Sequence, residues 1–176
     1  MNQNVMIITL LLISFIISGC VSIPKDLKAV DDFQVDRYLG RWYEIARLDH
    51  SFERGLNNVS AEYSLRDDGG IKVVNRGFNP ESGEWKTAEG KAYFVSGQNT
   101  GRLKVSFWGP FYGGYNIIGL DRENYSYALV CGSDKSYLWI LARTGELEEE
   151  IKNQLVEKAK VSGFETEKLI WVEQGK

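Results

Sequence analysis

Apolar and polar residues alternate in short runs along most of the chain between Trp42 and Arg143. In one of these runs Leu103, Val105 and Phe107 are separated by single polar residues. Since successive side chains of a strand point to opposite faces, such a run predicts a strand with one apolar and one solvated face. Turn-forming Gly, Asn and Asp residues separate the runs, so we expect tight connections. The predicted strands are Trp42–Leu48, Val59–Leu65, Ile71–Phe78, Trp85–Val95, Leu103–Trp108, Tyr115–Leu120, Tyr125–Cys131 and Tyr137–Arg143.

Eight strands joined by short connections form an antiparallel meander, and closing it into a barrel removes both exposed edges. The sequence therefore predicts an all-β fold, an eight-stranded antiparallel up-and-down β-barrel. Inside a barrel of this size, the apolar side chains either pack solidly or surround one small ligand.

The segment from Glu146 to Ser162 departs from the two-residue alternation. Its apolar residues recur four apart, which predicts an amphipathic helix. Thr144 is expected to cap its start and Gly163 to end it. A helix on a membrane surface carries a basic polar face, whereas this helix is acidic at its start, so we favour packing on the outside of the barrel. The run Leu169–Val172 predicts a short final strand.

The chain begins with an almost unbroken aliphatic run from Val5 to Ile17, which Ser18, Gly19 and Cys20 follow. An apolar run of about 7–15 residues before small residues is typical of a secretory signal peptide, and a bilayer span would need about 20. Residues 1–19 are therefore predicted to be a signal peptide. Because residues 1–4 contain no Lys or Arg, an ordinary signal peptide or an uncleaved anchor that happens to contain a cysteine is the alternative.

The small-small-Cys ending of this run resembles the lipobox of bacterial lipoproteins. The resemblance implies cleavage after Gly19, a diacylglycerol on the Cys20 thiol and a further acyl chain on the amine freed at Cys20. Stable anchoring takes two such signals. In those lipoproteins an Asp after the cysteine favours the inner membrane, so Val21 favours the outer membrane, on its periplasmic side. Residues 20–32 contain Pro24 and several charges but no apolar period, and we expect them to form the lipidated N-terminus and a tether.

Composition narrows the class of partner. The formal net charge is −3, with Lys and Arg scattered along the chain, which argues against nucleic-acid binding. By length, residues 33–176 form one domain. With Cys20 assigned to lipid, Cys131 is the second of two cysteines, and it ends an apolar run. We expect Cys131 to be a buried, unreactive thiol.

Two motifs far apart in the sequence resemble those of the lipocalins. A G-x-W motif at Gly40–Trp42 opens the first predicted strand, and Arg143 ends the eighth. In lipocalins the tryptophan fills the closed end of the barrel and the arginine packs across it, which implies structural roles for Gly40, Trp42 and Arg143. A guanidinium over an indole ring contributes about 0.5–2 kcal/mol. The stretch Arg41–Gly55 is similar to bacterial lipocalins close to apolipoprotein D, so the resemblance covers nearly the whole chain.

Members of that group are outer-membrane lipoproteins that bind fatty acids or lysophospholipids and are thought to maintain the membrane under stress. The resemblance implies that this chain stores or transports such a ligand in its barrel and is attached to the membrane through acylated Cys20. A homodimer is left open.

The residues expected to face inward on each strand give an apolar lining for the cavity. A shift of one residue in the pairing of a strand would exchange its inward and outward side chains. Tyrosine hydroxyls are expected to orient a polar head near the mouth, and plain core packing is the alternative for each aromatic residue. The predicted lining is Ala46, Leu48, Ala61, Tyr63, Phe94, Val105, Phe107, Tyr115 and Trp139.

Residue patterns for catalysis are hard to find. His50 is the single histidine and stands among charged residues, so we expect a solvated loop residue rather than a base or a ligand. The sequence has no Cys or His cluster at metal spacing and no G-x-S-x-G elbow. We therefore expect a binding protein rather than an enzyme, with no cofactor and no metal. Two rivals stay open: an enzyme acting on a lipophilic substrate in the same cavity, and an assembly lipoprotein whose solid barrel binds another protein.

Overall fold

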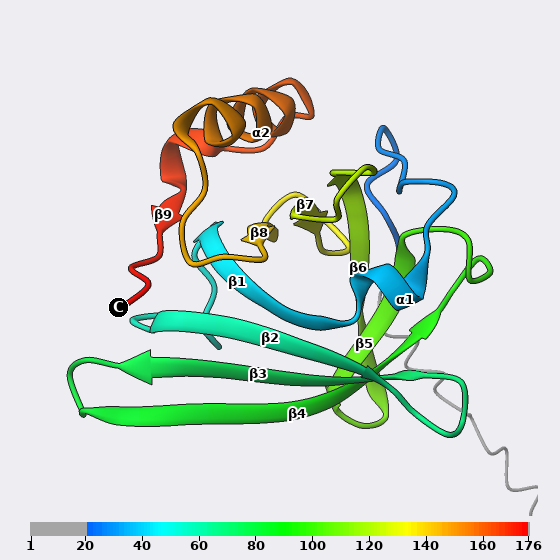
Figure 1. Ribbon diagram of the computed structural model, residues 1–176, viewed down its shortest axis with the longest axis horizontal. Helices are drawn as coiled ribbons and strands as arrows, with labels where there is room; N and C mark the ends of the chain where they lie inside the picture. The colour runs from blue at the N-terminus through cyan, green and yellow to red at the C-terminus, as the bar shows by residue number, and fades with distance from the viewer. Residues whose placement is uncertain (1–20, 176) are drawn as a thin grey trace, which may run out of the picture.

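A computed structural model describes residues 21–175, which form a closed β-barrel with a helix against its outside (Figure 1). Strands β1 to β8 pair antiparallel with their neighbours in the chain, and β1 also pairs with β8, which closes the barrel. A short ninth strand, β9, extends the sheet beside β1. The predicted all-β, eight-stranded up-and-down barrel with one C-terminal helix outside is confirmed. The elements are α1 (Val35–Tyr38), β1 (Gly40–Arg47), β2 (Asn57–Leu65), β3 (Ile71–Asn79), β4 (Glu84–Phe94), β5 (Arg102–Trp108), β6 (Phe111–Leu120), β7 (Tyr127–Cys131), β8 (Leu138–Ala142), α2 (Glu149–Val161), the 3₁₀ turn η1 (Thr166–Lys168) and β9 (Ile170–Trp171).

The largest difference from the predicted strand boundaries is at β6. This strand begins at Phe111 rather than at Tyr115, because most of the glycine-rich stretch after Trp108 continues the sheet. The β5–β6 connection is correspondingly tight, with Gly109 and Pro110 alone between the two strands. The hairpin therefore extends further than the sequence indicated.

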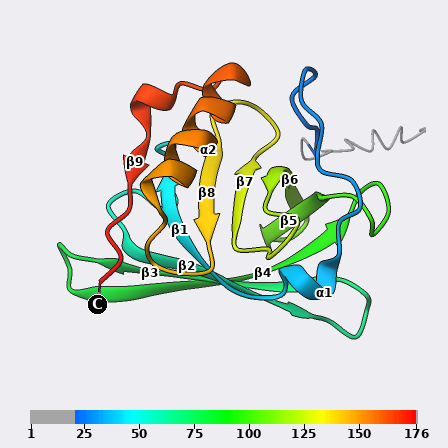
Figure 2. The ribbon, with the colours of Figure 1, turned by 45° about the horizontal axis from the view of Figure 1, so that its top comes forward.

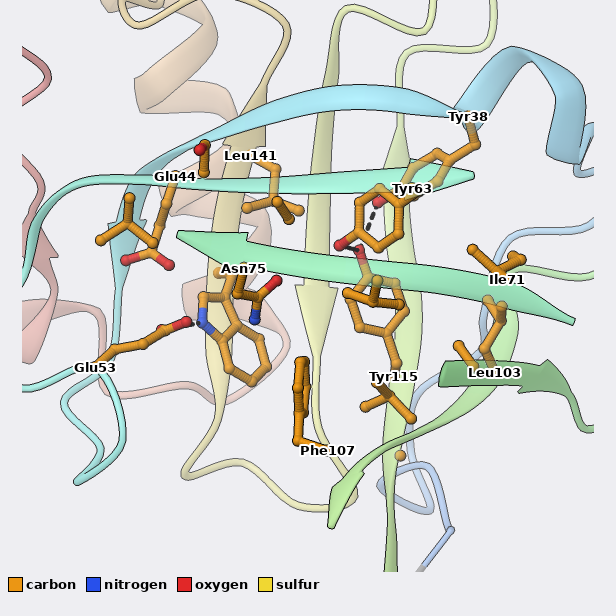
Figure 3. Close-up of a pocket in the computed structure, with 18 of the residues that line it drawn as sticks. Tyr38, Glu44, Glu53, Tyr63, Ile71, Asn75, Leu103, Phe107, Tyr115 and Leu141 are labelled. Carbon is orange, nitrogen blue, oxygen red and sulfur yellow. Dashed lines mark hydrogen bonds between the residues drawn. The ribbon is translucent and has the colours of Figure 1, made fainter. Parts of the chain in front are cut away.

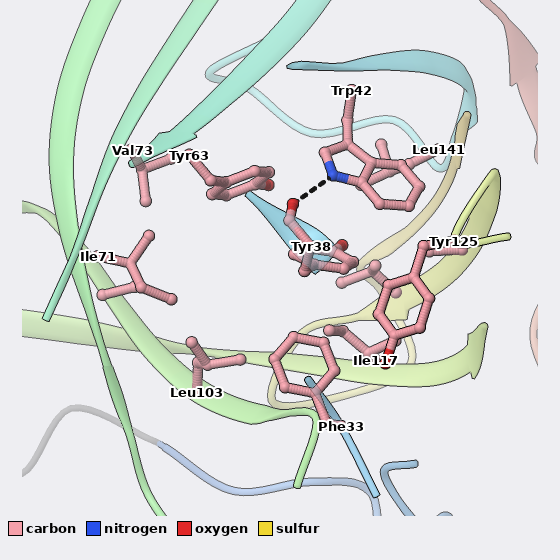
Figure 4. Packing of buried hydrophobic residues seen from close by; sticks show 13 residues of the cluster. Phe33, Tyr38, Trp42, Tyr63, Ile71, Val73, Leu103, Ile117, Tyr125 and Leu141 are labelled. Atoms are coloured by element: carbon pink, nitrogen blue, oxygen red, sulfur yellow. Dashed lines mark hydrogen bonds between the residues drawn. The ribbon is translucent and has the colours of Figure 1, made fainter. Parts of the chain in front are cut away.

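The barrel wall separates two apolar clusters, one inside it and one between the wall and α2. The inner cluster fills the closed half of the barrel (Figure 4). The outer cluster lies under α2, which crosses the outside of the barrel (Figure 2). Leu129 and Val130 are neighbours in β7, yet Leu129 belongs to the outer cluster and Val130 to the inner one. This is the strand alternation on which the sequence analysis relied.

Helix α2 packs against the barrel through Leu155 and Ala159, both buried in the outer cluster. Its N-cap is Glu148, without a side-chain hydrogen bond to the helix. The expected Thr144 cap is wrong, because the Thr144 hydroxyl donates to the Glu146 carbonyl at 2.6 Å instead. Gly163 follows the helix with a φ of 80°, a conformation that favours glycine at a helix end. Within residues 21–175 no helix is long and apolar enough to cross a membrane.

Trp42 closes one end of the barrel. Its indole is fully buried, and Nε1 donates to the carbonyl of Tyr38 at 2.8 Å. The Arg143 guanidinium lies over the indole with its Cζ 4.1 Å from the ring centroid, so the predicted contact is present. Gly40 has a φ of 88°, and a side chain there would also approach Arg143 Nη1, which explains the glycine. The guanidinium also donates to three main-chain carbonyls, those of Arg37 at 2.7 Å, Arg41 at 2.9 Å and Tyr125 at 3.2 Å.

The segment from residue 21 to residue 32, predicted to be a tether, runs along the barrel wall. The Ser22 hydroxyl donates to the Ser133 carbonyl at 3.2 Å, and the Ser22 carbonyl accepts from Asn116 Nδ2 at 3.2 Å. Further along, the backbone of Val30 hydrogen-bonds to β6 and to the residue before β5. The segment is thus held against the barrel from Ser22 onward. The predicted signal peptide, residues 1–19, and the lipidation site Cys20 lie outside the described residues.

Candidate functional site: the barrel cavity

A cavity occupies the barrel beyond the end that Trp42 closes. Since β1 starts at the closed end and neighbouring strands run in opposite directions, four connections lie at the other end, which we call the mouth: β1–β2, β3–β4, β5–β6 and β7–β8. The cavity volume is ≈ 100 Å³. This is below the usual range of ligand pockets, about 300–1,000 Å³. The space is therefore narrow, with room for a slim molecule.

Most of the predicted lining residues do line this cavity (Figure 3). The structure adds a group of apolar residues from the inner phases of β3, β4, β5 and β8 and from the segment before α1. The predicted residues that line the cavity are Ala61, Tyr63, Val105, Phe107, Tyr115 and Trp139, and the added apolar ones include Phe33, Ile71, Val73, Ala92, Leu103 and Leu141.

Three residues of the predicted lining lie elsewhere. Ala46 and Leu48 belong to the outer cluster under α2, so their expected inward phase is wrong. The reason is a register shift of β1 against β8 between Glu44 and Ala46, because a bulge inserts a residue and changes which face the following side chains occupy. Phe94 faces inward but lies at the closed end of β4, where it packs on the inner cluster beside Phe33 without reaching the cavity.

Three tyrosine hydroxyls meet at the deep end of the cavity. The hydroxyl of Tyr115 lies 2.7 Å from that of Tyr38 and 2.9 Å from that of Tyr63 (Figure 3). Burial raises the pKa of all three well above the ordinary tyrosine range, which keeps them protonated. Tyr63 stands opposite Gly40 in the β1–β2 pairing, near the closed end. The expectation that tyrosine hydroxyls lie near the mouth is therefore wrong.

Charged groups occupy the mouth end of the cavity, which the sequence analysis missed. Glu44 and Glu53 both line the cavity. Arg47 Nη1 donates to Glu44 Oε1 at 2.7 Å, and Arg47 Nη2 donates to the Glu53 carbonyl at 2.9 Å. Glu53 Oε2 accepts from Trp139 Nε1 at 3.1 Å and lies 3.1 Å from His50 Nε2. These contacts bind the β1–β2 connection to both β1 and β8.

His50 is buried, so its assignment as a solvated loop residue is wrong. Its ring stacks on Phe52 with 4.0 Å between the centroids. The Nε2 atom of the same ring lies 3.1 Å from Glu53 Oε2. Burial follows from the fold of the whole connection over the mouth, which local charge content does not reveal. The position of Glu44 could have been found, because it stands two residues after Trp42 and so shares its face of β1.

The two carboxyl groups are held in different states. Burial raises the pKa of Glu44 well above its ordinary value, and the nearby charge of Glu53 raises it further, against the opposing effect of Arg47. Burial acts in the same direction on Glu53, but the close approach of His50 and the hydrogen bond from Trp139 outweigh it and hold the pKa of Glu53 below its ordinary value. The mouth therefore holds one carboxylate that stays ionised and a second group that protonates more readily.

Reactive and metal-ligating groups contribute little to this cavity. Cys131 is a free, buried thiol in the outer cluster, as expected, and burial raises its pKa to about 12. In the part of the chain that the structure describes, no group of three or more His, Cys, Asp or Glu residues could hold a metal ion. What the arrangement offers is a narrow apolar space with hydroxyls at its floor and charges at its mouth.

Comparisons with known proteins agree with this geometry. A family model described as a lipocalin-like domain matches residues 33–174. The chain is 57% identical over 167 residues to an outer membrane lipoprotein named Blc from Vibrio cholerae, covering 95% of this chain and 98% of that one. It is 32% identical over 171 residues to mouse apolipoprotein D, covering 92% and 85% of the two chains. Among solved structures, insecticyanin from the tobacco hornworm shares the fold, with a TM-score of 0.70 at 21% identity over 90% of this chain and 88% of that one.

The match over residues 33–174 spans the barrel, α2 and β9. The relatives that are named outer membrane lipoproteins extend over nearly the whole chain. This chain therefore belongs to the lipocalin family, as a lipid-anchored protein of the outer membrane whose barrel suits a small hydrophobic ligand.

Proposed function

We propose that the barrel binds one lipid with a single long chain, a fatty acid or a lysophospholipid, and that the protein stores or carries it to maintain the outer membrane under stress. The observation that carries the proposal is the narrow apolar cavity, which is closed at one end by Trp42 and reached from the mouth. Each methylene buried there contributes about 0.8 kcal/mol. A chain of many methylenes therefore gains enough free energy to bind without specific polar contacts.

The polar groups of the cavity favour one orientation of the ligand. The tyrosine hydroxyls at the floor already hydrogen-bond to one another, whereas the ionisable side chains lie at the mouth end, namely Glu44, Arg47, His50 and Glu53. A buried charged head would need compensating partners. We therefore propose that the tail enters first and that the head group stays at the mouth.

We further propose that acylated Cys20 is the membrane anchor. The strands and helices of the barrel domain lie between Val35 and Trp171, so Cys20→Ser is expected to leave the fold intact and to release the protein from the membrane. The fraction of protein that sediments with outer membranes after a salt wash measures this. Unchanged sedimentation of Cys20→Ser would contradict the assignment.

The test of ligand binding is a titration of the chain from Val21 onward with single-chain lipids of increasing length. We expect about one lipid per barrel and an affinity that rises with chain length until the cavity is full. Trp139 lines the cavity, so its fluorescence is expected to change on binding. Failure of every fatty acid and lysophospholipid to bind would refute the proposal.

A matched pair of variants on β2 tests the location. Ala61 lines the cavity, while its neighbour Glu62 is exposed on the outside. Ala61→Phe fills part of the space and is expected to weaken binding at least tenfold, or about 1.4 kcal/mol. Glu62→Phe is expected to bind as the parent does. Equal binding by both variants would remove the cavity from the proposal, and breakdown of the bound lysophospholipid would replace the carrier with an enzyme.

A further inference from the structure

Two exposed aromatic residues form the tip of the β5–β6 hairpin. Trp108 and Phe111 stand opposite each other across the Gly109-Pro110 turn. Their exposed fractions are 83% for Trp108 and 53% for Phe111. Phe107, next in the strand, faces the cavity instead. The hairpin therefore carries its aromatic rings outward at the mouth, directly beside the cavity.

Two other connections at the mouth also carry exposed aromatic residues. Phe52 lies in the β1–β2 connection and is 58% exposed, and Trp85 lies at the start of β4 and is 48% exposed. Within residues 21–175 the remaining exposed large aromatic residue is Trp171, on β9. Tryptophan and other amphipathic aromatic rings accumulate where protein meets the interface of a membrane. The mouth thus carries the groups suited to a lipid surface.

The N-terminal segment reaches the barrel close to this hairpin. A Cβ on Gly114 would lie 2.7 Å from the carbonyl oxygen of Ser22, so the two residues are in direct contact. Gly114 is three residues from Phe111 along β6, which is about 10 Å at the rise of an antiparallel strand. Cys20 precedes Ser22 by two residues, a reach of at most about 7 Å. An acyl anchor on Cys20 is therefore attached within about 20 Å of the hairpin tip.

We propose that the aromatic hairpin tip, Trp108 and Phe111, docks on the lipid surface that carries the anchor and holds the mouth against it. The proposal rests on the acylation of Cys20 and is independent of which ligand the cavity binds. Anchor and hairpin together give two attachment points, which fix the orientation of the barrel where a single attachment point would not.

The structure favours a lipid surface over a second protein as the occupant. A stable protein interface buries about 800 Å² on each partner, and a hairpin tip with a two-residue turn offers only a small contact. Lys104 lies beside the hairpin with its Nζ 4.9 Å from the centroid of the Tyr112 ring. A lysine at that place adds attraction to anionic head groups, worth about 1 kcal/mol near a membrane surface. Both features agree with shallow insertion of aromatic rings among lipid head groups.

The experiment uses the full acylated protein in vesicles of phosphatidylethanolamine and phosphatidylglycerol whose acyl chains carry bromine, which quenches tryptophan on contact. We expect the parent protein to lose emission in brominated vesicles relative to unbrominated ones. Trp108→Ser is expected to abolish most of that loss. Trp171→Ser removes an exposed tryptophan on the outer wall, whose ring centroid lies 5.7 Å from Lys152 Nζ of α2. It is the matched control, expected to retain the full loss.

Several outcomes would overturn the proposal. One is equal bromine quenching in the parent and in Trp108→Ser, and another is loss of quenching in Trp171→Ser instead. A third outcome is that Trp108 shows no bromine quenching but becomes better protected from a water-soluble quencher as the protein density on the vesicle rises. This would assign the hairpin to a contact with a second copy of the chain. Because Trp108 is exposed, its replacement leaves the core unchanged, and circular dichroism of each variant checks this. Phe111→Ser gives a second variant that keeps all tryptophans and is expected to reduce the quenching.

Discussion

The contact between Arg143 and Trp42 predicts a measurable coupling at the closed end of the barrel. Arg143→Ala removes a guanidinium 4.1 Å from the indole centroid and its hydrogen bonds to three carbonyls. Hydrogen bonds from a charged group contribute about 1.5–3 kcal/mol each when buried. Arg143 is only half-buried, so water replaces part of this. We expect Arg143→Ala to lower the free energy of unfolding by about 2–4 kcal/mol.

The part of this loss that belongs to the indole can be isolated with a double-mutant cycle. Trp42→Leu keeps apolar bulk at the closed end but removes the aromatic face, so it keeps the core filled better than Trp42→Ala, which is expected to cost about 3–5 kcal/mol. We expect Trp42→Leu and Arg143→Ala to couple by about 0.5–2 kcal/mol, the range for a cation over an aromatic ring.

Equilibrium unfolding in urea measures each free energy, and Arg41→Ala is the matched control. Arg41 is on the same end of the barrel, but its side chain is 59% exposed and pairs with Glu62 at 3.0 Å on the surface. Such a pair contributes at most about 1 kcal/mol. Strictly additive effects of Trp42→Leu and Arg143→Ala, or an Arg41→Ala loss as large as that of Arg143→Ala, would refute the reasoning.

Three further outcomes follow from single residues. Glu44→Gln should change how stability depends on pH. Because the pKa of Glu44 is raised in the folded state, the parent loses stability as pH rises through the ordinary Glu range toward that raised pKa. Urea unfolding at pH 4.5 and 7.5 should show this loss in the parent and not in the variant, and an equal change in both proteins would contradict the reasoning. Cys131, with its pKa of about 12, should resist iodoacetamide at pH 8 in the folded protein and react once urea unfolds it, as mass spectrometry would show; rapid alkylation of folded protein would count against its burial. Gly40→Ala should lower the melting temperature, because φ is 88° there, while an unchanged temperature would mean that the backbone relaxes without cost.

The strands that follow a simple alternation could be predicted from the sequence, and those that depend on a partner strand could not. The phase of Val105 and Phe107 on β5 follows from their own neighbours. The bulge that turns Ala46 outward arises in the pairing of β1 with β8, which are far apart in the chain. Local pattern contains no sign of that mismatch, so the lining from β1 was predicted wrongly.

The mouth shows the same limit for polar residues. His50 stands among charged residues, which suggested solvent. In the structure its partners include Glu53 in the same connection and Trp139 from β8, whose ring centroid lies 5.2 Å away. Likewise Thr144 is a residue type that often caps helices, but its hydroxyl donates to the Glu146 carbonyl instead. Which of several nearby partners a polar group chooses is decided by the folded arrangement.

The narrowness of the cavity has a consequence for selection among lipids. The protein is anchored in a membrane whose bulk lipids carry two or more acyl chains, so any binder there faces a large excess of them. A cavity of only ≈ 100 Å³ leaves little room for a second chain, whatever the head group. We expect the barrel not to bind intact bilayer lipids and to bind lipids that have lost all but one acyl chain, whatever their head group. Its selectivity then depends on the number of acyl chains and is set by the side chains that line the cavity.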